Sequence, residues 1–316
     1  MRILVTGSGG FVGRHLIRHL LECGDQVIAA YHPREIVLPD AGLRNYSFDI
    51  LDVNALEEVV AGEKVEAVIH LAALAFVPDA DKDPGQTMAV NVGGTANLLQ
   101  SLAVYQPQAR ILLVSSSEVY DASQRERMPL GEHSPIRPNN YYALSKWLAE
   151  NLALWAIKER GMDIVIARPF NHIGPGQSPR FAVSGFARQL AAIAAGRVAP
   201  ILEVGDLEVQ RDMSDVRDIV QAYRLALEKI PVGTVFNICS GQPYKIGWLL
   251  EQLISLAQCD VEVRVDPRRL RKRDVPFLSG SCKLFKDHTG WATQVSIFKT
   301  LYDTLDYWRQ IEDEQS

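Results

Sequence analysis

Cysteine is scarce in this sequence, and the few cysteines form no recognisable pattern. Cys23, Cys239, Cys259 and Cys282 lie far apart, and none belongs to a CxxC or Cys/His ligand spacing. Thiols placed in this way are typical of reduced, separately packed side chains in a cytosolic protein. We therefore expect no disulfide framework and no metal site.

Long apolar runs and an excess of basic residues are also lacking. No apolar run approaches the roughly 18 residues that a transmembrane helix requires, and no signal peptide pattern is visible at the first residues. The 33 Lys and Arg residues are outnumbered by 38 Asp and Glu residues, for a formal charge of −5. We therefore expect a cytoplasmic protein with no membrane partner and no nucleic-acid partner.

The rest of the composition is that of an ordinary globular protein. Hydrophobic residues make up 47% and charged residues 22% of the 316 residues. A chain of this length can bury a large core and is long enough for two lobes.

The start of the sequence has the pattern of a βαβ unit. Arg2–Thr6 is predicted to be a strand, Arg14–Glu22 a helix and Gln26–Tyr31 a second strand, with a glycine-rich turn over 7–13. In such a unit the glycines allow a tight turn and a close approach to a pyrophosphate, and the helix N-terminus presents free N–H groups to the phosphates. The pattern predicts a dinucleotide site, with a tight turn that binds nothing as the alternative.

Strands and helices keep alternating up to residue 168. The predicted strands are Asn45–Phe48, Val65–Leu71, Arg110–Val114 and Asp163–Arg168, and the predicted helices are Asn54–Val60, Gln86–Tyr105 and Tyr142–Arg160. Repeated βα units build an α/β fold with a Rossmann-like, doubly wound parallel sheet, whose ligands bind in the crevice at the carboxyl ends of the strands. We expect residues 1–168 to form this dinucleotide-binding domain.

Beyond residue 168 the alternation becomes irregular. Phe181–Ala195 and Ile246–Ala257 are predicted helices, and Thr234–Cys239 and Val261–Val265 are predicted strands. Residues 169–316 are therefore expected to form a smaller α/β substrate-binding lobe. The helix Val216–Lys229 has a strongly apolar face, so about 214–229 is predicted to pack back on the first domain.

Tyr142 and Lys146 stand at the start of one predicted helix. Residues four apart share a helix face, so the phenol and the ammonium are expected to lie side by side. A neighbouring cation favours the phenolate and lowers the pKa of a tyrosine from its free value of about 10, which would make Tyr142 a proton donor and acceptor. Because such pairs also occur on many solvated helices, this interpretation depends on the residues that accompany them.

Those residues resemble a known family. The stretch Thr6-Gly7-Ser8-Gly9-Gly10-Phe11-Val12-Gly13, together with Ser116, Tyr142 and Lys146, resembles the extended short-chain dehydrogenases/reductases of the nucleotide-sugar epimerase/dehydratase group. The stretches 167–177, 204–208 and 215–223 are most similar to the bacterial GDP-4-keto-6-deoxy-D-mannose reductases, which form GDP-D-rhamnose. GDP-mannose 4,6-dehydratases share part of the pattern.

The resemblance implies an enzyme and assigns roles to its residues. The implied reaction is the NAD(P)H-dependent reduction of the 4-keto group of GDP-4-keto-6-deoxy-D-mannose. Tyr142 would protonate the sugar oxygen, Ser116 would donate a hydrogen bond to it, and Lys146 would hold Tyr142 in a state of low pKa and bind the nicotinamide ribose. A GDP-mannose 4,6-dehydratase, a sugar-nucleotide 4-epimerase and, more distantly, a non-catalytic dinucleotide-binding regulator remain alternatives.

Glu118 does not separate these alternatives. In the dehydratases a glutamate at this position helps to remove water from the sugar, and Ser116-Ser117-Glu118 resembles both groups of enzymes. The other interpretation is that Ser117 and Glu118 only contact the substrate or the neighbouring backbone.

The cofactor residues follow from the glycine turn and from the family. They are Gly7, Gly10, Phe11, Val12, Gly13, Arg34, Asp49, Ile50, Leu71, Ala72, Ala73, Tyr142 and Lys146. The end of the second strand and the residues after it, Ala29–Arg34, contain no acid that could bind a ribose diol, and both His32 and Arg34 could meet a 2′-phosphate. NADP(H) is therefore favoured and NAD(H) is possible. The alternative is that Arg34 is only an exposed residue of a mobile loop.

The second lobe is expected to bind the GDP-linked deoxyhexose. Asn171, Arg211 and Arg271 match family positions that contact the nucleotide, and Asp274 replaces a usual glutamate beside a possible ribose contact.

The family also suggests a homodimer formed by the helices Gln86–Tyr105 and Tyr142–Arg160. Their apolar stripes are Leu98, Leu99 and Leu102 on the first helix and Leu148, Leu152 and Trp155 on the second. The alternative is that these stripes belong to the core.

Overall fold

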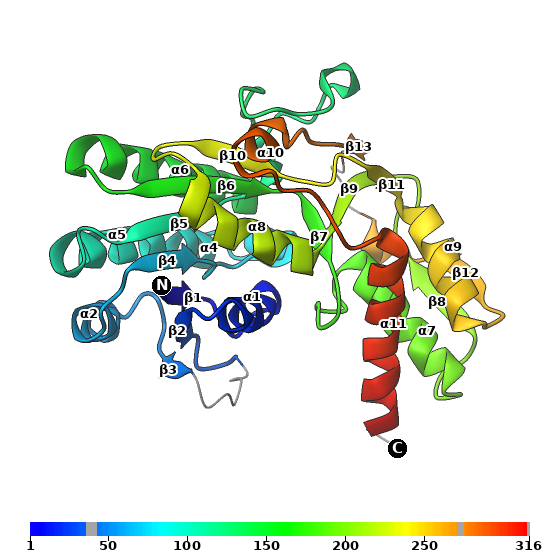
Figure 1. Cartoon of the computed structure of the whole chain (residues 1–316). Helices are drawn as coiled ribbons and strands as arrows, with labels where there is room; N and C mark the ends of the chain where they lie inside the picture. The colour runs from blue at the N-terminus through cyan, green and yellow to red at the C-terminus, as the bar shows by residue number, and fades with distance from the viewer. Residues whose placement is uncertain (36–42, 271–274, 315–316) are drawn as a thin grey trace.

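The fold is built on one large parallel sheet. The computed structural model describes residues 1–35, 43–270 and 275–314. In spatial order the seven strands are β10 (Val235–Ile238), β6 (Ile164–Pro169), β5 (Arg110–Val114), β4 (Ala67–His70), β1 (Arg2–Thr6), β2 (Gln26–Tyr31) and β3 (Arg44–Ser47). Each pair of neighbours is parallel, which confirms the predicted doubly wound α/β fold (Figure 1).

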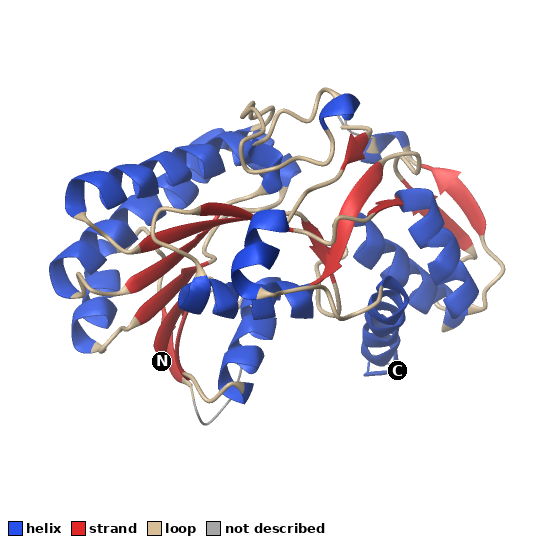
Figure 2. Ribbon diagram, turned by 45° about the horizontal axis from the view of Figure 1, so that its top comes forward, coloured by secondary structure: helices blue, strands red, loops and turns tan. Residues whose placement is uncertain are grey.

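Helices cover both faces of this sheet (Figure 2). One face carries α1 (Phe11–Glu22), α8 (Val216–Lys229) and α10 (Lys283–Thr289), and the other carries α2 (Val53–Gly62), α5 (Gly94–Tyr105) and α6 (Tyr141–Arg160). Side chains of a strand alternate between faces, so Ile3 and Val5 of β1 enter the first core and Leu4 enters the second. Strands buried on both faces read as continuous apolar runs, which is why the sequence predicts them well.

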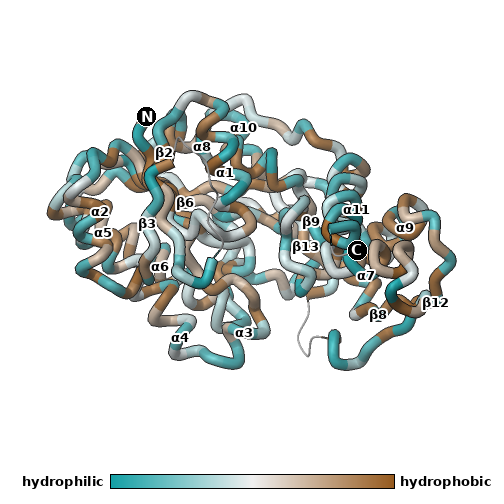
Figure 3. The backbone as a smooth tube through the Cα atoms, turned by 90° about the horizontal axis from the view of Figure 1, so that it is seen from below, coloured by the Kyte–Doolittle hydropathy of each residue, from teal (hydrophilic) through white to brown (hydrophobic). Residues whose placement is uncertain are grey.

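The second lobe has a core of its own. A small sheet contains β7 (Asn171–Ile173), β9 (Gln210–Asp215), β11 (Pro243–Lys245) and β13 (Phe277–Leu278), while β8 (Ile201–Val204) pairs with β12 (Glu262–Val265). The helices α7 (Ala182–Ala194), α9 (Ile246–Ala257) and α11 (Ile297–Glu314) enclose a third hydrophobic cluster with these strands. Hydrophobic stretches accordingly run through both lobes (Figure 3).

After residue 168 the chain returns to the first lobe more than once. Helix α8 packs on α1, β10 joins the main sheet beside β6, and α10 covers β10. From the sequence, only about 214–229 of this part is predicted to pack on the first lobe. A strand as short as β10 has no pattern that says which sheet it joins, so its place is set by tertiary packing.

The predicted helix Gln86–Tyr105 is interrupted in the structure. It consists of α4 (Pro84–Met88), a π-helical turn over Ala89–Gly93, and α5. The turn holds the buried Asn91, whose Oδ1 accepts a hydrogen bond from the Leu74 amide (2.8 Å) and whose Nδ2 donates to Ser145 Oγ (2.8 Å). The π turn thus fixes a loop of the first lobe to α6. A short helix before it, α3 (Val77–Lys82), was not predicted.

The predicted apolar stripes differ in how deeply their residues are buried. Leu98, Leu99 and Leu102 are buried in the second core, so they do not form a surface. Leu152 also packs against that core, whereas 51% of Trp155 is exposed. None of the helices that the structure describes combines the length and the apolar character needed to span a bilayer.

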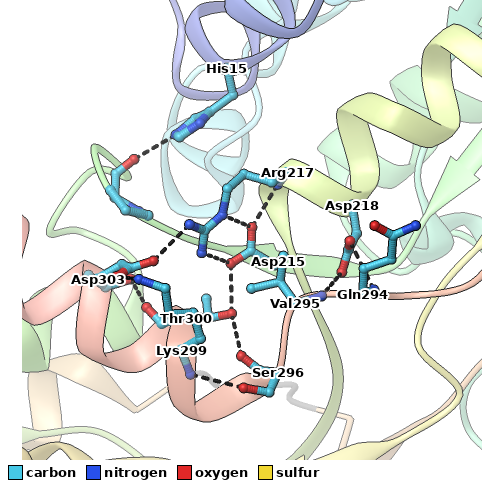
Figure 4. Close-up of polar contacts among 12 residues, drawn as sticks. His15, Asp215, Arg217, Asp218, Gln294, Val295, Ser296, Lys299, Thr300 and Asp303 are labelled. Atoms are coloured by element: carbon cyan, nitrogen blue, oxygen red, sulfur yellow. Dashed lines mark hydrogen bonds and ion pairs between the residues drawn. The ribbon is translucent and has the colours of Figure 1, made fainter.

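A buried carboxylate joins α8 to α11 (Figure 4). Asp215 accepts hydrogen bonds from the Arg217 amide (2.7 Å), from the Arg217 guanidinium (2.8 and 2.7 Å) and from Thr300 Oγ1 (2.7 Å). Arg217 also donates to Asp303 of α11 (2.7 Å). Because α8 lies on the first lobe and α11 on the second, these contacts fix the two lobes to each other.

Replacing Thr300 by Val tests this junction. The change removes one hydrogen bond to a buried carboxylate, so we expect the free energy of unfolding to fall by about 2 kcal/mol in urea denaturation. Thr304→Val is the matched control, because the Thr304 hydroxyl only donates to the backbone oxygen of Thr300 (2.7 Å). It should cost about 0.5 kcal/mol. Equal losses in the two variants would show that the bond to Asp215 has no special weight.

Candidate active site

A cleft of about 1820 Å³ opens at the carboxyl ends of the main-sheet strands and is lined by both lobes. The predicted site residues that the structure describes all line it. From the first lobe these are Gly7, Gly10, Phe11, Val12, Gly13, Arg34, Asp49, Ile50, Leu71, Ala72, Ala73, Ser116, Ser117, Glu118, Tyr142 and Lys146, and from the second Asn171 and Arg211. The predicted residues Arg271 and Asp274 lie outside the described residues.

At one end of the cleft the glycine turn meets helix α1. A Cβ on Gly13 would lie 2.5 Å from the carbonyl oxygens of Gly7 and Ser8, so only glycine allows the helix to come this close. Gly10 precedes α1 without a side-chain cap, and the first turn holds no acidic residue. The first amides of the helix therefore remain available to an anion, and the helix dipole favours one. A pyrophosphate fits this turn.

The loop after β2 carries an acid that was not predicted. The stretch up to Arg34 contains no acid, but Glu35 follows directly and lies against the glycine turn. A Cβ on Gly9 would come within 2.6 Å of the Glu35 Cβ, and Glu35 Oε2 accepts a hydrogen bond from the His32 amide (3.1 Å). The signal in the sequence was an acid directly after Arg34. This end of the cleft therefore offers both a guanidinium and a carboxylate.

The proton-transfer residues come from two elements that meet in the cleft. Asn140 caps α6 by accepting from the Ala143 amide (2.8 Å), which places Tyr142 in the first turn. Ser116 follows β5, and its hydroxyl lies near enough to the Tyr142 phenol to lower the pKa of that phenol. Lys146 lies one turn further along α6, where its Nζ donates to the carbonyl oxygen of Val114 at the end of β5 (2.8 Å).

The pKa of Tyr142 moves in the direction opposite to the sequence-based expectation. Burial raises the pKa of Tyr142 to about 12, the nearby Ser116 hydroxyl opposes this, and the negative charge of Glu118 adds to it. The ammonium of Lys146 is directed to the Val114 carbonyl, so a shared helix face does not bring the cation onto the phenol. The phenol therefore stays protonated at neutral pH and is suited to donating a proton.

Burial also dominates at Lys146. It lowers the pKa of Lys146 to about 8, while the negative charge of Glu150 on the same helix acts in the other direction. Lys146 is thus a cation at neutral pH, but its pKa lies only a little above that pH. His70 nearby is uncharged, because burial first and the Lys146 charge second lower its pKa to about 3.

The substrate residues surround this centre. Glu118 Oε2 accepts from Asn140 Nδ2 (3.2 Å), and Ser117 is buried beside it. Within the described residues the buried Asn171 Oδ1 has no hydrogen-bond partner, which marks a polar atom that a ligand could satisfy. Arg211 from β9 lies 9% exposed and donates to the Gln210 carbonyl (2.9 Å).

Two lining residues at the mouth of the cleft were not predicted. Arg180 forms a bidentate ion pair with Asp79 of α3 (both bonds 2.6 Å) and lies 3.9 Å above the ring of Phe76. Phe76 and Arg180 line the cleft from different lobes. The sequence held no signal for this contact, because both residues lie outside the motifs and far apart along the chain.

Comparison with known proteins agrees with this geometry. The NAD dependent epimerase/dehydratase family matches residues 3–239, and the chain belongs to this family. It is 40% identical over 308 residues to GDP-6-deoxy-D-mannose reductase of Pseudomonas aeruginosa, covering 97% of each chain.

Solved structures show the same likeness. RMD from Pseudomonas aeruginosa, complexed with NADPH, is 37% identical with a TM-score of 0.88 over 98% of this chain and 99% of that one. UDP-glucose 4-epimerase from Thermotoga maritima, with UDP-glucose, is 28% identical with a TM-score of 0.90 over 99% of this chain and 100% of that one.

Replacing Gly13 by Ala tests the glycine turn as a dinucleotide site. The new Cβ would push α1 away from the turn, so we expect the Kd for a nicotinamide dinucleotide, measured by fluorescence titration, to rise at least about tenfold. Gly62→Ala is the control, since a Cβ there would meet nothing within 4 Å and should leave the Kd unchanged. An unchanged Kd in Gly13→Ala would mean that the pyrophosphate binds elsewhere.

Proposed function

We propose that this protein reduces the 4-keto group of GDP-4-keto-6-deoxy-D-mannose with NAD(P)H to give a GDP-6-deoxyhexose, GDP-D-rhamnose. The observation that carries the proposal is that Ser116, a protonated Tyr142 and Lys146 line one cleft together with the glycine turn. The 40% identity to a GDP-6-deoxy-D-mannose reductase supports this substrate class.

The proposed chemistry needs a hydride at carbon and a proton at oxygen. A nicotinamide cofactor, when bound, supplies the hydride. As the C–H bond forms, the electron pair of the C=O bond moves to the oxygen, which takes the phenolic proton of Tyr142. Ser116 donates a hydrogen bond to the same oxygen and stabilises its developing charge. The Tyr142 phenolate then regains a proton from solvent, so one ketone consumes one hydride and one proton.

The cofactor is proposed to be NADP(H) in preference to NAD(H). The first turn of α1 would hold the pyrophosphate, Arg34 would meet the 2′-phosphate and Lys146 the nicotinamide ribose. Glu35 at the same end of the cleft offers a partner for a ribose diol, which gives NAD(H) a place as well. The Pseudomonas aeruginosa RMD complexed with NADPH supports the preference.

The substrate contacts are proposed for the second lobe. Asn171 and Arg211 would bind the nucleotide. The buried Asn171 Oδ1, which has no hydrogen-bond partner within the part of the chain that the structure describes, supports this. The proposal places the reaction in the cytoplasm, where the four free thiols of this chain are ordinary.

A dehydratase is the second candidate, because Glu118 lies in the cleft with its charge close enough to raise the pKa of Tyr142. A base at this place could remove a proton from the sugar. In the reductase the same carboxylate, bonded to Asn140, would only bind substrate.

The deciding experiment adds GDP-4-keto-6-deoxy-D-mannose to the purified protein with NADPH and follows its absorbance. Stoichiometric oxidation of NADPH supports the reductase, and NMR of the product gives the configuration at C4. No oxidation, together with conversion of GDP-mannose to the keto sugar without added cofactor, would establish the dehydratase and make Glu118 its base.

Replacing Tyr142 by Phe removes the proposed proton donor and little else. We expect kcat to fall by at least about a hundredfold while the Kd for NADPH stays within about twofold. Turnover and binding are measured on the same preparation. Unchanged turnover would rule out Tyr142 as the acid, and lost binding of NADPH would show that its role is structural.

A homodimer is also proposed, formed by α5 and α6. Trp155 and Leu154 of α6 are 51% and 40% exposed, and Val104 at the end of α5 is 57% exposed. Arg160 lies 5.1 Å above the Trp155 ring and donates to Gln100 of α5 (2.7 Å), so these exposed side chains form one surface.

Trp155→Glu tests this surface by placing a charge in it. We expect the unchanged protein to sediment as a dimer in analytical ultracentrifugation and Trp155→Glu as a monomer. Phe298→Glu, which changes another exposed aromatic side chain (54%) on α11, should remain dimeric. Dimers in both variants would place the interface elsewhere.

A further inference from the structure

A buried carboxylate lies directly behind the proton-transfer residues. Glu150 is on α6, one helical turn beyond Lys146, and only 1% of it is exposed. Arg168, at the end of β6, donates to Glu150 Oε1 through Nε (2.9 Å) and to Oε2 through Nη2 (2.6 Å). The hydroxyl of Ser115, at the end of β5, donates to Glu150 Oε1. The Glu150 side chain therefore links α6, β5 and β6, each of which has one end at the cleft.

Each of these elements carries a predicted site residue or is followed closely by one. Ser115 precedes Ser116, Arg168 lies three positions before Asn171, and Glu150 shares its helix with Tyr142 and Lys146. The alignment of Ser116 with Tyr142 depends on how β5 is fixed to α6. Two contacts make that connection: Lys146 Nζ donates to the Val114 carbonyl, and the Ser115 hydroxyl donates to Glu150.

The other titratable groups near Glu150 have defined partners or charge states. Arg168 is also bonded to the Glu132 carbonyl (3.3 Å) and lies 4.8 Å above the ring of Tyr120, so Glu150 is its carboxylate partner. Burial raises the pKa of Tyr120 to about 12, so Tyr120 is neutral at pH 7. His70, from β4, is neutral as well. The negative charge that acts on Lys146 is that of Glu150.

We propose that Glu150 is a positioning residue of the reductase: its bonds to Ser115 and Arg168 hold Ser116 in line with Tyr142, and its charge keeps Lys146 cationic. This rests on the proposed function, in which Lys146 donates to the nicotinamide ribose, and an ammonium has more N–H donors for that contact than a neutral amine has. Burial by itself would favour the neutral form of Lys146. The carboxylate of Glu150, one helical turn away, counteracts this effect.

The test compares Glu150→Gln with Glu159→Gln. Glu159 is on the same helix but exposed, with an ion pair to Lys158 (3.6 Å), so its variant should behave as the unchanged protein. Both kcat and KM are measured against pH, and the Kd for NADPH is measured against pH by fluorescence. Activity that needs a charged Lys146 is lost as the pH rises through the Lys146 pKa, which is about 8.

In Glu150→Gln that alkaline loss should move to lower pH by about one unit, because the group that supports the Lys146 charge is gone. We also expect kcat at neutral pH to fall at least about tenfold with KM within about threefold, since the loss affects alignment and not substrate binding. The pH dependence of the NADPH Kd should shift in the same direction.

Glu150→Gln leaves Arg168 without its carboxylate, so the variant could fail to fold. The double variant Glu150→Met with Arg168→Met avoids a lone buried charge and should keep the melting temperature within a few degrees. Its alkaline loss should also lie at lower pH than that of the unchanged protein. Coinciding pH profiles in the double variant and the unchanged protein would overturn the proposal and leave the pair a structural role.

Failure of the proposed function is visible separately. If the unchanged protein does not oxidise NADPH with the keto sugar, the reductase assignment fails. The pH dependence of NADPH binding still reports whether Glu150 acts on Lys146 in that case, because it needs no turnover.

Discussion

The parallel pairing of the main sheet is the constraint on which the site depends. Parallel strands run in one direction, so their carboxyl ends and the segments that follow them gather at one edge. The glycine turn follows β1, Ser116 follows β5 and Asn171 follows β6. Helix α6 returns from the loop after β5 and brings Tyr142 back to the same edge. Residues that are more than a hundred positions apart therefore meet in one cleft.

Burial decides the charge states in that cleft more strongly than pairwise contact does. It raises the pKa of Tyr142 and lowers the pKa of Lys146, so each group is held closer to its neutral form. A phenol that stays protonated is suited to giving a proton to a ketone. A lysine that is only just cationic needs a nearby negative charge, and Glu150 has one. The buried pair of Glu150 and Arg168 thus connects the electrostatics of the site to its framework.

The two lobes are connected at two places. Asp215 and Arg217, at the start of α8, are bonded to α11 of the second lobe. At the mouth of the cleft, Arg180 reaches Asp79 of the first lobe. The substrate side of the cleft is therefore formed by a lobe whose position is fixed at two places. Among the described residues, the buried Asn171 Oδ1 in this cleft has no hydrogen-bond partner.

The sequence by itself determined the sheet, the glycine turn, the Tyr142 helix and the family. Each of these can be recognised from local periodicity or from a contiguous motif. The sequence did not determine the position of β10, the π turn at Asn91 or the burial of Leu98, since these depend on which surfaces the chain brings together. The direction of the Tyr142 pKa and the place of Glu35 against the glycine turn belong to the same class. Charge states depend on surroundings in three dimensions, and only tertiary structure decides which carboxylate, cation or apolar wall surrounds a group.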